Sequence, residues 1–191
     1  SWYKNRSMLP LIALHFASLQ ITLHAQKLEI KNGLRTTLII VISDKDNYYY
    51  AYIGDGGIMC LREDGSTENI MIPQKFDNTL PNMLSASLGP TVEGAPNYGY
   101  QKKEQGDLLV LGTDGVFDRI RTNPFSKYIR HSVVQKNGNL NEVVKNVTAE
   151  LSEEKDQNGN YIFDDNLTLA IIGTGDKPNF PKGYWKKSDS L

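Results

Sequence analysis

The segment 107-DLLVLGTDGVFD-118 joins a short apolar run to two aspartates placed four residues apart. Asp107 to Gly112 is a continuous apolar run, which is typical of a short strand buried on both faces. Asp114 and Asp118 follow the end of this strand, with Gly115 beside the first. A strand end holds a carboxylate in a fixed position, and a neighbouring glycine lets backbone, water or a ligand approach closely. The segment therefore predicts a binding or catalytic site at the end of this strand.

Two other segments repeat this combination of an acidic residue with glycine or asparagine at a strand end. They are Ile53-Gly54-Asp55-Gly56-Gly57 and Asp164-Asp165-Asn166. Each alone is also consistent with an ordinary turn, because Asp-Gly is a common turn pair. If the carboxylates converge, they repel one another unless a cation lies among them. Hard divalent ions such as Mg²⁺ and Mn²⁺ suit oxygen ligands of this kind.

The residues around these segments predict a mostly antiparallel sheet structure. Thr36 to Ser43 and Tyr48 to Ile53 are β-branched and aromatic runs joined by turn residues, so they predict a hairpin. A second hairpin is expected from Ile58 to Arg62 and Thr67 to Ile72, with its turn at Asp64-Gly65. Leu167 to Ile172 is the last predicted strand.

Helical segments are fewer. Asn139 or Asn141 can cap a helix whose apolar residues fall on one face, namely Leu140, Val143, Val144, Val147 and Leu151. Residues 73 to 106 are rich in Pro, Gly, Asn and Ser and predict loop, with a short helix near Leu80 to Leu88. Adjacent hairpins with helices gathered elsewhere indicate a layered α+β fold.

The longest apolar stretch, Leu9 to Ala25, allows two interpretations. Five of its residues recur at steps of three and four, as on the buried stripe of a core helix: Leu9, Ile12, Phe16, Leu19 and Leu23. The alternative is a signal peptide, with Lys4 and Arg6 as its basic start. We favour the core helix, and polar interruptions make the stretch a poor membrane-spanning helix, so no membrane partner is expected. Localisation stays open, with the cytoplasm preferred.

The amino-acid composition excludes several classes of partner and metal site. The chain has 191 residues, 21 basic and 22 acidic, for a net charge of -1. This balance gives no basic field, so nucleic acid is not an expected partner. The single cysteine, Cys60, excludes an internal disulfide and multi-cysteine zinc sites, and the three histidines have no paired-ligand spacing. Any bound metal must therefore have oxygen ligands.

Taken in order, five segments resemble the metal-dependent protein serine/threonine phosphatases of the protein phosphatase 2C type. The most specific is Asp107 to Asp118, which is similar to the stretch that carries a metal aspartate in that family. Asp165-Asn166-Leu167-Thr168 resembles its closing Asp-Asn-x-Thr motif. Ala51 to Gly57 resembles the family's Gly-Asp-Ser/Gly motif, and Ser87-Leu88-Gly89 resembles its Leu-Gly segment. Arg35-Thr36-Thr37 resembles its Gly-Thr-Thr strand start, although the glycine before the threonines is absent here.

The resemblance implies a sandwich of two mainly antiparallel sheets flanked by helices. It implies Asp114 and Asp165 as ligands of a binuclear Mg²⁺ or Mn²⁺ centre, and Asp55, Asp118 and Asp114 around a weaker third metal. Gly54, Gly115 and Asn166 would support them. The implied reaction is hydrolysis of phosphoserine or phosphothreonine in a protein substrate by metal-activated water.

The family's first motifs, an acidic residue and an Asp-Gly-His-Gly segment that bridges both metals, have no counterpart before Thr36, where Glu29 is the lone acidic residue. We therefore expect residues 1 to 175 to form the C-terminal two thirds of such a domain, followed by a tail from 176 to 191. The remainder would lie on the same or another chain. Because two carboxylates hold Mg²⁺ weakly, these 191 residues alone should be inactive.

Two alternatives stay open. One is a catalytically inactive relative that acts as a regulatory or binding module. The other is an unrelated exported β-rich domain that begins at Met8 with a signal peptide.

Overall fold

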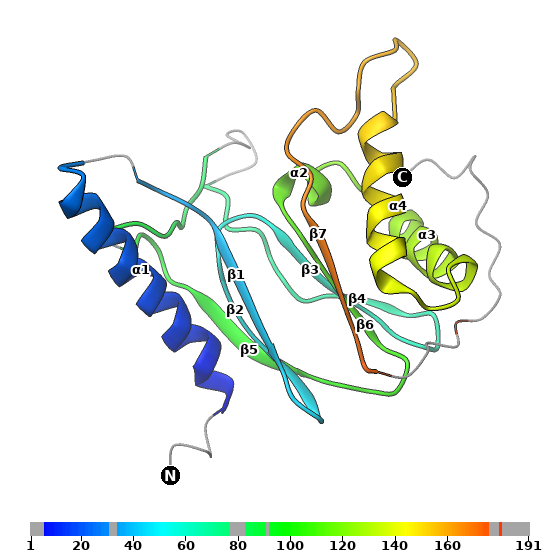
Figure 1. Ribbon diagram of the computed structural model, residues 1–191, viewed down its shortest axis with the longest axis horizontal. Coiled ribbons are helices and arrows are strands. Elements are labelled where there is room, and N and C mark those ends of the chain that lie inside the picture. The colour runs from blue at the N-terminus through cyan, green and yellow to red at the C-terminus, as the bar shows by residue number, and fades with distance from the viewer. Residues whose placement is uncertain (1–5, 31–33, 77–82, 91, 176–179, 181–191) are drawn as a thin grey trace. The chain divides into compact units, whose positions relative to one another are not determined.

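The computed structural model describes residues 6–30, 34–76, 83–90, 92–175 and 180 (Figure 1). The chain folds into two compact units. Unit 1 comprises Ser1–Asp55 and Pro73–Lys103, and unit 2 comprises Gly56–Ile72 and Glu104–Leu191. The backbone therefore passes from one unit to the other three times.

Unit 1 is built on a three-stranded antiparallel sheet in the order β1-β2-β5, with β1 at Leu38–Ser43, β2 at Asn47–Ile53 and β5 at Asn97–Lys102. The first predicted hairpin is thus confirmed. Its turn is held by Asp44, whose Oδ1 accepts hydrogen bonds from the backbone N–H groups of Asp46 and Asn47 at 2.9 and 2.8 Å. Strand β5 was not expected, because its Gly, Gln and Lys residues fall in a stretch that predicts loop.

Helix α1 (Leu9–Lys27) follows a short 3₁₀ turn at Arg6–Met8 and packs on β1 and β2 (Figure 1). The helix was expected, but the predicted buried face is wrong. Leu14, Ser18 and Ala25 are buried, with Leu11, Ala17 and Ile21 packed beside them. The predicted core stripe instead faces solvent: Ile12, Phe16, Leu19 and Leu23 are exposed.

The reason for this inversion is that α1 is apolar on both faces, so periodicity cannot choose between them. The side that packs carries small residues, which permit close approach. Ser18 is buried there, and its hydroxyl donates a 2.7 Å hydrogen bond to the carbonyl of Gly89. Over Arg6–Lys27 the helix is long and apolar enough to cross a membrane by length and composition, a test that core helices and signal sequences also pass.

Unit 2 contains a four-stranded antiparallel sheet in the order β4-β3-β6-β7. Strands β3 (Gly57–Leu61) and β4 (Thr67–Asn69) form the second predicted hairpin, with β4 shorter than expected. Strand β6 (Leu108–Gly112) is central and almost wholly buried, as its apolar run predicts, and β7 (Leu169–Gly173) is an edge strand. Cys60 lies inside β3 with no exposed surface, and burial raises the pKa of its thiol to about 12.

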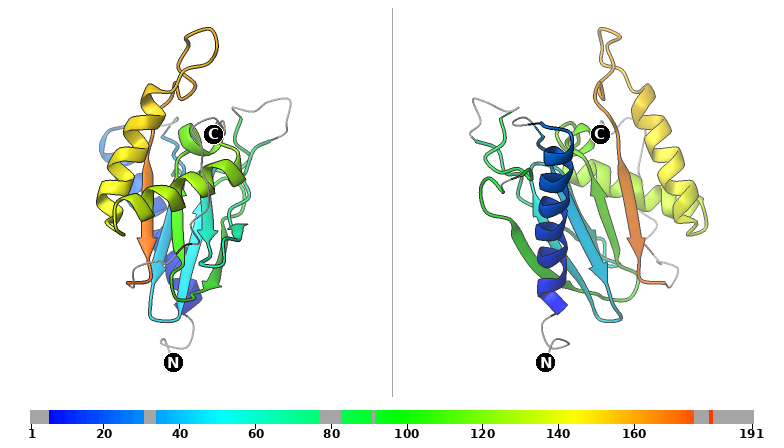
Figure 2. Two further views of the ribbon diagram at one scale, coloured as in Figure 1. Left: turned by 90° about the vertical axis from the view of Figure 1, so that its right-hand side faces the viewer. Right: turned by 60° about the vertical axis from the view of Figure 1, so that its left-hand side comes forward.

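In its described residues, unit 2 also has three helices: α2 (Asp114–Phe117), α3 (Thr122–Gln135) and α4 (Leu140–Glu153). Figure 2 shows α4 beside β7, with α3 crossing the same sheet. The α4 prediction is confirmed, including its cap: Asn139 Oδ1 accepts from the Glu142 N–H at 3.3 Å, and Val143, Val147 and Leu151 are buried. Sequence reasoning did not find α3.

The predicted helix near Leu80 to Leu88 is wrong where the structure describes it. Residues 77–82 lie outside the described residues, and the part from 83 onward is extended. Leu84 forms an antiparallel bridge with Lys75, and Leu88 forms one with Thr36. The tail from 176 to 191 also lies outside the described residues apart from Phe180, which is buried in the core of unit 2.

Candidate metal site

Asp114 is placed at the end of β6 by the start of α2. Thr113 has extended backbone angles and precedes the helix, so the chain turns sharply and Asp114 becomes the first helical residue. The Asp114 carboxylate accepts a 2.9 Å hydrogen bond from the Gly115 N–H. One turn later the Asp118 N–H donates to the Asp114 carbonyl at 2.8 Å, which places both aspartates on one side of the helix. Asp114 is half-buried and Asp118 is exposed.

Thr113 also joins this strand end to the segment that carries Asp165. Its backbone N–H donates to the Thr168 carbonyl at 3.1 Å, and its hydroxyl donates to the Asn166 carbonyl at 3.1 Å. The same hydroxyl oxygen accepts from the Thr168 N–H at 3.3 Å. Asp165 itself accepts a 2.6 Å hydrogen bond from the Asn166 N–H. Two aspartates that are 51 positions apart in the sequence are therefore held on adjoining segments.

Gly115 is required for this contact because the two segments approach very closely. A Cβ atom at position 115 would lie 2.5 Å from the carbonyl oxygen of Asn166 and 3.4 Å from Cβ of Asp165. The obstacle at 2.5 Å is backbone, which cannot turn aside as a flexible side chain could. Predicted supporting residues Gly115 and Asn166 thus form the contact between the Asp114 and Asp165 segments.

The ring of Phe117 fixes the direction of α2, a role that sequence reasoning did not find. It fills the space beside the two glycines that pair across β3 and β6. A Cβ atom at Gly57 would lie 2.0 Å from the ring, and one at Gly112 would lie 2.9 Å from it. The signal in the sequence was a glycine at the end of each strand, which permits an aromatic ring to pack directly on backbone.

Asp55 belongs to unit 1 and follows β2 after one intervening residue, Gly54. Gly54 turns the chain there with φ of +110°, a conformation that favours glycine, and exchanges hydrogen bonds with Gln74. A Cβ atom at Gly54 would lie 2.3 Å from Cγ2 of Thr37. Asp55 is 7% exposed. Its membership of one site with Asp114 stays a prediction.

The motif segments within unit 1 also meet one another. Thr36 and Leu88 exchange two backbone hydrogen bonds of 2.8 Å each. Gly89 lies so close to the segment before β1 that a Cβ atom at position 89 would be 2.8 Å from the carbonyl oxygen of Leu34. The threonine segment therefore contacts both the Gly54 turn and the Leu88-Gly89 segment, although the three are far apart in the sequence.

The predicted ligands are of the type that a hard divalent cation binds, but too few of them are grouped together. Carboxylate oxygens are the ligands that Mg²⁺ and Mn²⁺ prefer. Among the residues that the structure describes, however, no three His, Cys, Asp or Glu side chains are grouped so that they could hold a metal ion. Asp164 is turned to another partner, since Arg119 forms an ion pair with it at 2.9 Å. The role of Asp114 and Asp165 as metal ligands therefore stays a prediction.

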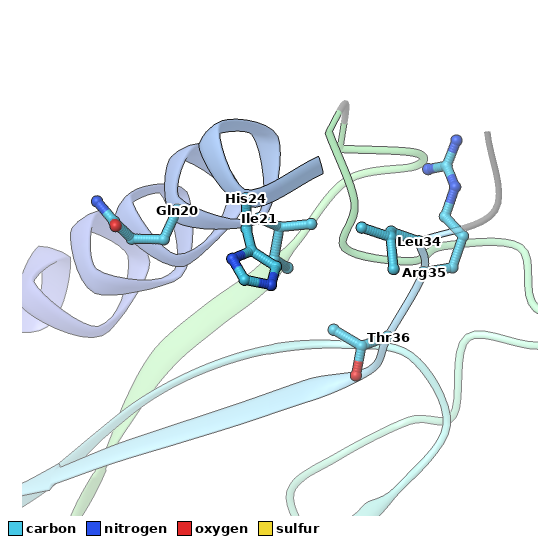
Figure 3. A pocket seen from close by; sticks show the side chains of 6 residues that line it. All are labelled: Gln20, Ile21, His24, Leu34, Arg35 and Thr36. Carbon is cyan, nitrogen blue, oxygen red and sulfur yellow. The ribbon is translucent and has the colours of Figure 1, made fainter. Parts of the chain in front are cut away.

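A separate hollow of about 430 Å³ lies in unit 1 between α1 and the segment before β1 (Figure 3). Its lining combines apolar and polar side chains without any carboxylate: Gln20, Ile21, His24, Leu34, Arg35 and Thr36. Arg35 forms an ion pair with Glu93, and Arg6, outside this hollow, forms one with Asp44. None of the predicted metal residues lines this hollow.

The sequence model of the family described as protein phosphatase 2C matches residues 7–154. The chain belongs to this family. Two curated relatives from Oryza sativa subsp. japonica, assigned as protein phosphatases 2C 23 and 24, are 29% and 35% identical over 98 and 97 residues. Each match covers 51% of this chain and 30% of the relative, so the chain spans less than a third of these relatives.

Solved structures show the same fold. The serine/threonine phosphatase PstP/Ppp of Mycobacterium tuberculosis superposes with a TM-score of 0.65 at 16% identity, over 88% of this chain and 73% of that one. The catalytic domain of PstP in complex with two manganese ions gives a TM-score of 0.59 at 19% identity, over 81% and 64% of the two chains. The predicted fold class, two mainly antiparallel sheets with helices of the protein phosphatase 2C type, is thereby confirmed.

Proposed function

We propose that the protein is a metal-dependent serine/threonine phosphatase that hydrolyses phosphoserine and phosphothreonine in protein substrates. The observation that carries this proposal is the contact between Asp114-Gly115 and Asp165-Asn166, which joins the two most specific motifs of the chain. Family membership supports the reaction class, and a manganese-bound relative with the same fold supports the choice of Mg²⁺ or Mn²⁺.

The proposed roles follow from position. Asp114 and Asp165 would be ligands of a binuclear centre, and Asp118 with Asp55 would contribute to a weaker third site. Gly115 and Asn166 would hold the two main ligands at their spacing, and Gly54 would orient Asp55. When bound, the metal ions would activate water for attack on the phosphate ester.

We further propose that residues 1–175 are one part of the catalytic domain and that 176–191 form a tail. Two adjoining carboxylates hold Mg²⁺ weakly, because this ion sheds its water reluctantly and needs several protein oxygens. The residues that complete the centre would come from the same polypeptide or from another chain. The 191-residue chain alone is then expected to bind metal weakly and to have no turnover.

Manganese titration followed by NMR tests the site even when binding is weak. Paramagnetic Mn²⁺ at millimolar concentration should broaden the amide signals of Gly115 and Asn166 before others. The double variant Asp114→Asn with Asp165→Asn should abolish this selective broadening, and Asp164→Asn should leave it unchanged because Asp164 pairs with Arg119. Broadening centred elsewhere, or unaffected by the double variant, would refute the site.

The second candidate function is a catalytically inactive binding module, and the incomplete donor set in the described residues favours it. Turnover decides between the two. A longer natural polypeptide, or a complex with a second chain, that contains an Asp-Gly-His-Gly segment should dephosphorylate a phosphothreonine peptide if the enzyme proposal is right. Failure of such a complete form to do so, while Mn²⁺ still binds at Asp114 and Asp165, would favour the inactive module.

A further inference from the structure

The outward face of α1 carries an apolar seam that no described residue covers. Ile12, Phe16, Leu19 and Leu23 are 49%, 61%, 50% and 51% exposed. They are separated by four, three and four positions, which is the spacing of a and d residues in a heptad. On a helix this seam lies opposite Leu14 and Ser18, which face the sheet. We call these four residues the α1 seam.

We propose that the α1 seam pairs with the α1 seam of a second copy of this chain, as an antiparallel helix pair. The spacing of the seam residues, four, three and four positions, is the same when the helix is followed in either direction. In an antiparallel pair, where a residues face d residues, Phe16 meets Leu19 of the second copy and Ile12 meets its Leu23. All four residues are then covered by the same four residues, which is the requirement of a twofold interface.

The charge of the helix agrees with self-pairing. From Leu9 to Gln26 the chain has no Asp, Glu, Lys or Arg. Identical helices can therefore meet without like charges opposing each other, and there is nothing to attract a charged partner segment. Antiparallel pairing also sets the two helix dipoles in opposite directions.

Two other occupants fit less well. A further helix in the same layer of the domain would lie beside α1 on the sheet, whereas the seam points away from the sheet. A helix that lies in a membrane surface is typically flanked by lysine and arginine along its length, and this one is not. The proposed surface is distinct from the candidate metal site and does not depend on the proposed phosphatase function.

The small area of the α1 seam indicates how tightly the proposed dimer should associate. Four half-exposed side chains present less than the roughly 800 Å² per partner of a standard stable interface. The dimer should therefore be reversible, with a dissociation constant on the order of 10–100 µM.

Sedimentation velocity of the 191-residue protein between 1 and 500 µM tests the proposal. We expect a shift from monomer to dimer across this range. Phe16→Asp should weaken the dimer at least tenfold, and Leu19→Gln should weaken it in the same direction. Val134→Asp is the matched control, because Val134 is a 40% exposed apolar residue on α3, and it should leave the dimer unchanged.

Circular dichroism of each variant checks that the fold is kept, which is expected because the seam does not pack on the sheet. A protein that stays monomeric at 500 µM would overturn the proposal, as would a dimer that Phe16→Asp does not weaken. Binding of the monomer to vesicles of phosphatidylcholine and phosphatidylserine, abolished by Phe16→Asp, would show that lipid is the occupant and overturn it equally.

Discussion

Thr113 and Thr168 hold each other through a 3.1 Å bond from the Thr113 N–H and a 3.3 Å bond to the Thr113 hydroxyl. Through this pair, the end of β6 and the start of β7 are fixed side by side. The aspartates next to each threonine segment, Asp114 and Asp165, take their positions from it. The geometry of the candidate metal site thus depends on a residue that would not itself bind metal.

Replacement of Thr113 by valine tests this dependence. Valine keeps the shape of threonine but removes a hydroxyl that both donates to Asn166 and accepts from Thr168. We expect a loss of about 1 kcal/mol in the free energy of unfolding and weaker Mn²⁺-induced broadening at Asn166. Thr148→Val in α4 is the control and should change the signals at Asn166 very little. Equal effects of both variants would show that Thr113 has no special role.

Gly115→Ala should separate the two aspartate segments. The added Cβ would meet the Asn166 carbonyl at 2.5 Å, so the backbone must shift, at a cost of about 1–3 kcal/mol in the free energy of unfolding. Gly173→Ala in β7 is the control, since its Cβ would meet only the tip of the Leu140 side chain, at 3.1 Å. Urea unfolding measures both. A Gly115→Ala protein as stable as the control would contradict the close contact described.

Gly54→Ala should be more damaging still. Its φ of +110° is unfavourable for alanine, and the new Cβ would overlap Thr37 at 2.3 Å. Together these effects predict a loss of about 3 kcal/mol. The second substitution Thr37→Gly should restore part of this loss, because it removes the overlap but not the backbone strain. Thermal unfolding of the single and double variants gives the comparison, and an absence of any rescue would show that Thr37 is not the obstacle.

The β1–β2 turn should show a defined pH dependence. A hydrogen bond from Arg6, with others from the backbone N–H groups of Asp46 and Asn47, lowers the pKa of Asp44 well below its usual range. A lowered carboxyl pKa contributes stability that is present above the unfolded value, about 4, and is lost as the pH falls toward the folded value. Stability from this group should therefore be constant from pH 7 to about pH 4 and decline below it.

Carbon-detected NMR titration of the Asp44 carboxyl tests this assignment of cause. Arg6→Gln should raise the pKa of Asp44 toward its ordinary value, because the charged donor is lost. Arg119→Gln, which removes a different surface ion pair, should leave the pKa of Asp44 unchanged. A pKa of Asp44 that does not rise in Arg6→Gln would mean that the backbone donors alone set it.

Local patterns in the sequence predicted most strands and α4, because alternating or continuous apolar runs with turn residues at their ends have few other solutions. The Asp114 and Asp165 segments were also found, since glycine and asparagine mark the close approach. Helix α1 shows the limit of such patterns. Ile12 and Leu14 are equally apolar, and what decides which is buried is the closeness that Ser18 and Ala25 allow at the sheet. Similarly, β5 pairs with β2 through backbone hydrogen bonds, and the side chains of β5 have no pattern that predicts a strand.

The route of the backbone restricts how this protein can be cut or assembled. Since the chain leaves unit 1 after Asp55, returns at Pro73 and departs again after Lys103, neither unit is one uninterrupted piece of polypeptide. A gene fusion, a splice event or a protease that divides the chain once cannot separate the two units from each other, because one of the two fragments always carries residues of both. The smallest fragment that retains all of unit 1 runs from Ser1 to Lys103 and necessarily carries the apolar strand β3, with β4, but without its partner strand β6. Fragments of this kind are expected to aggregate, so both units must be inherited and expressed together.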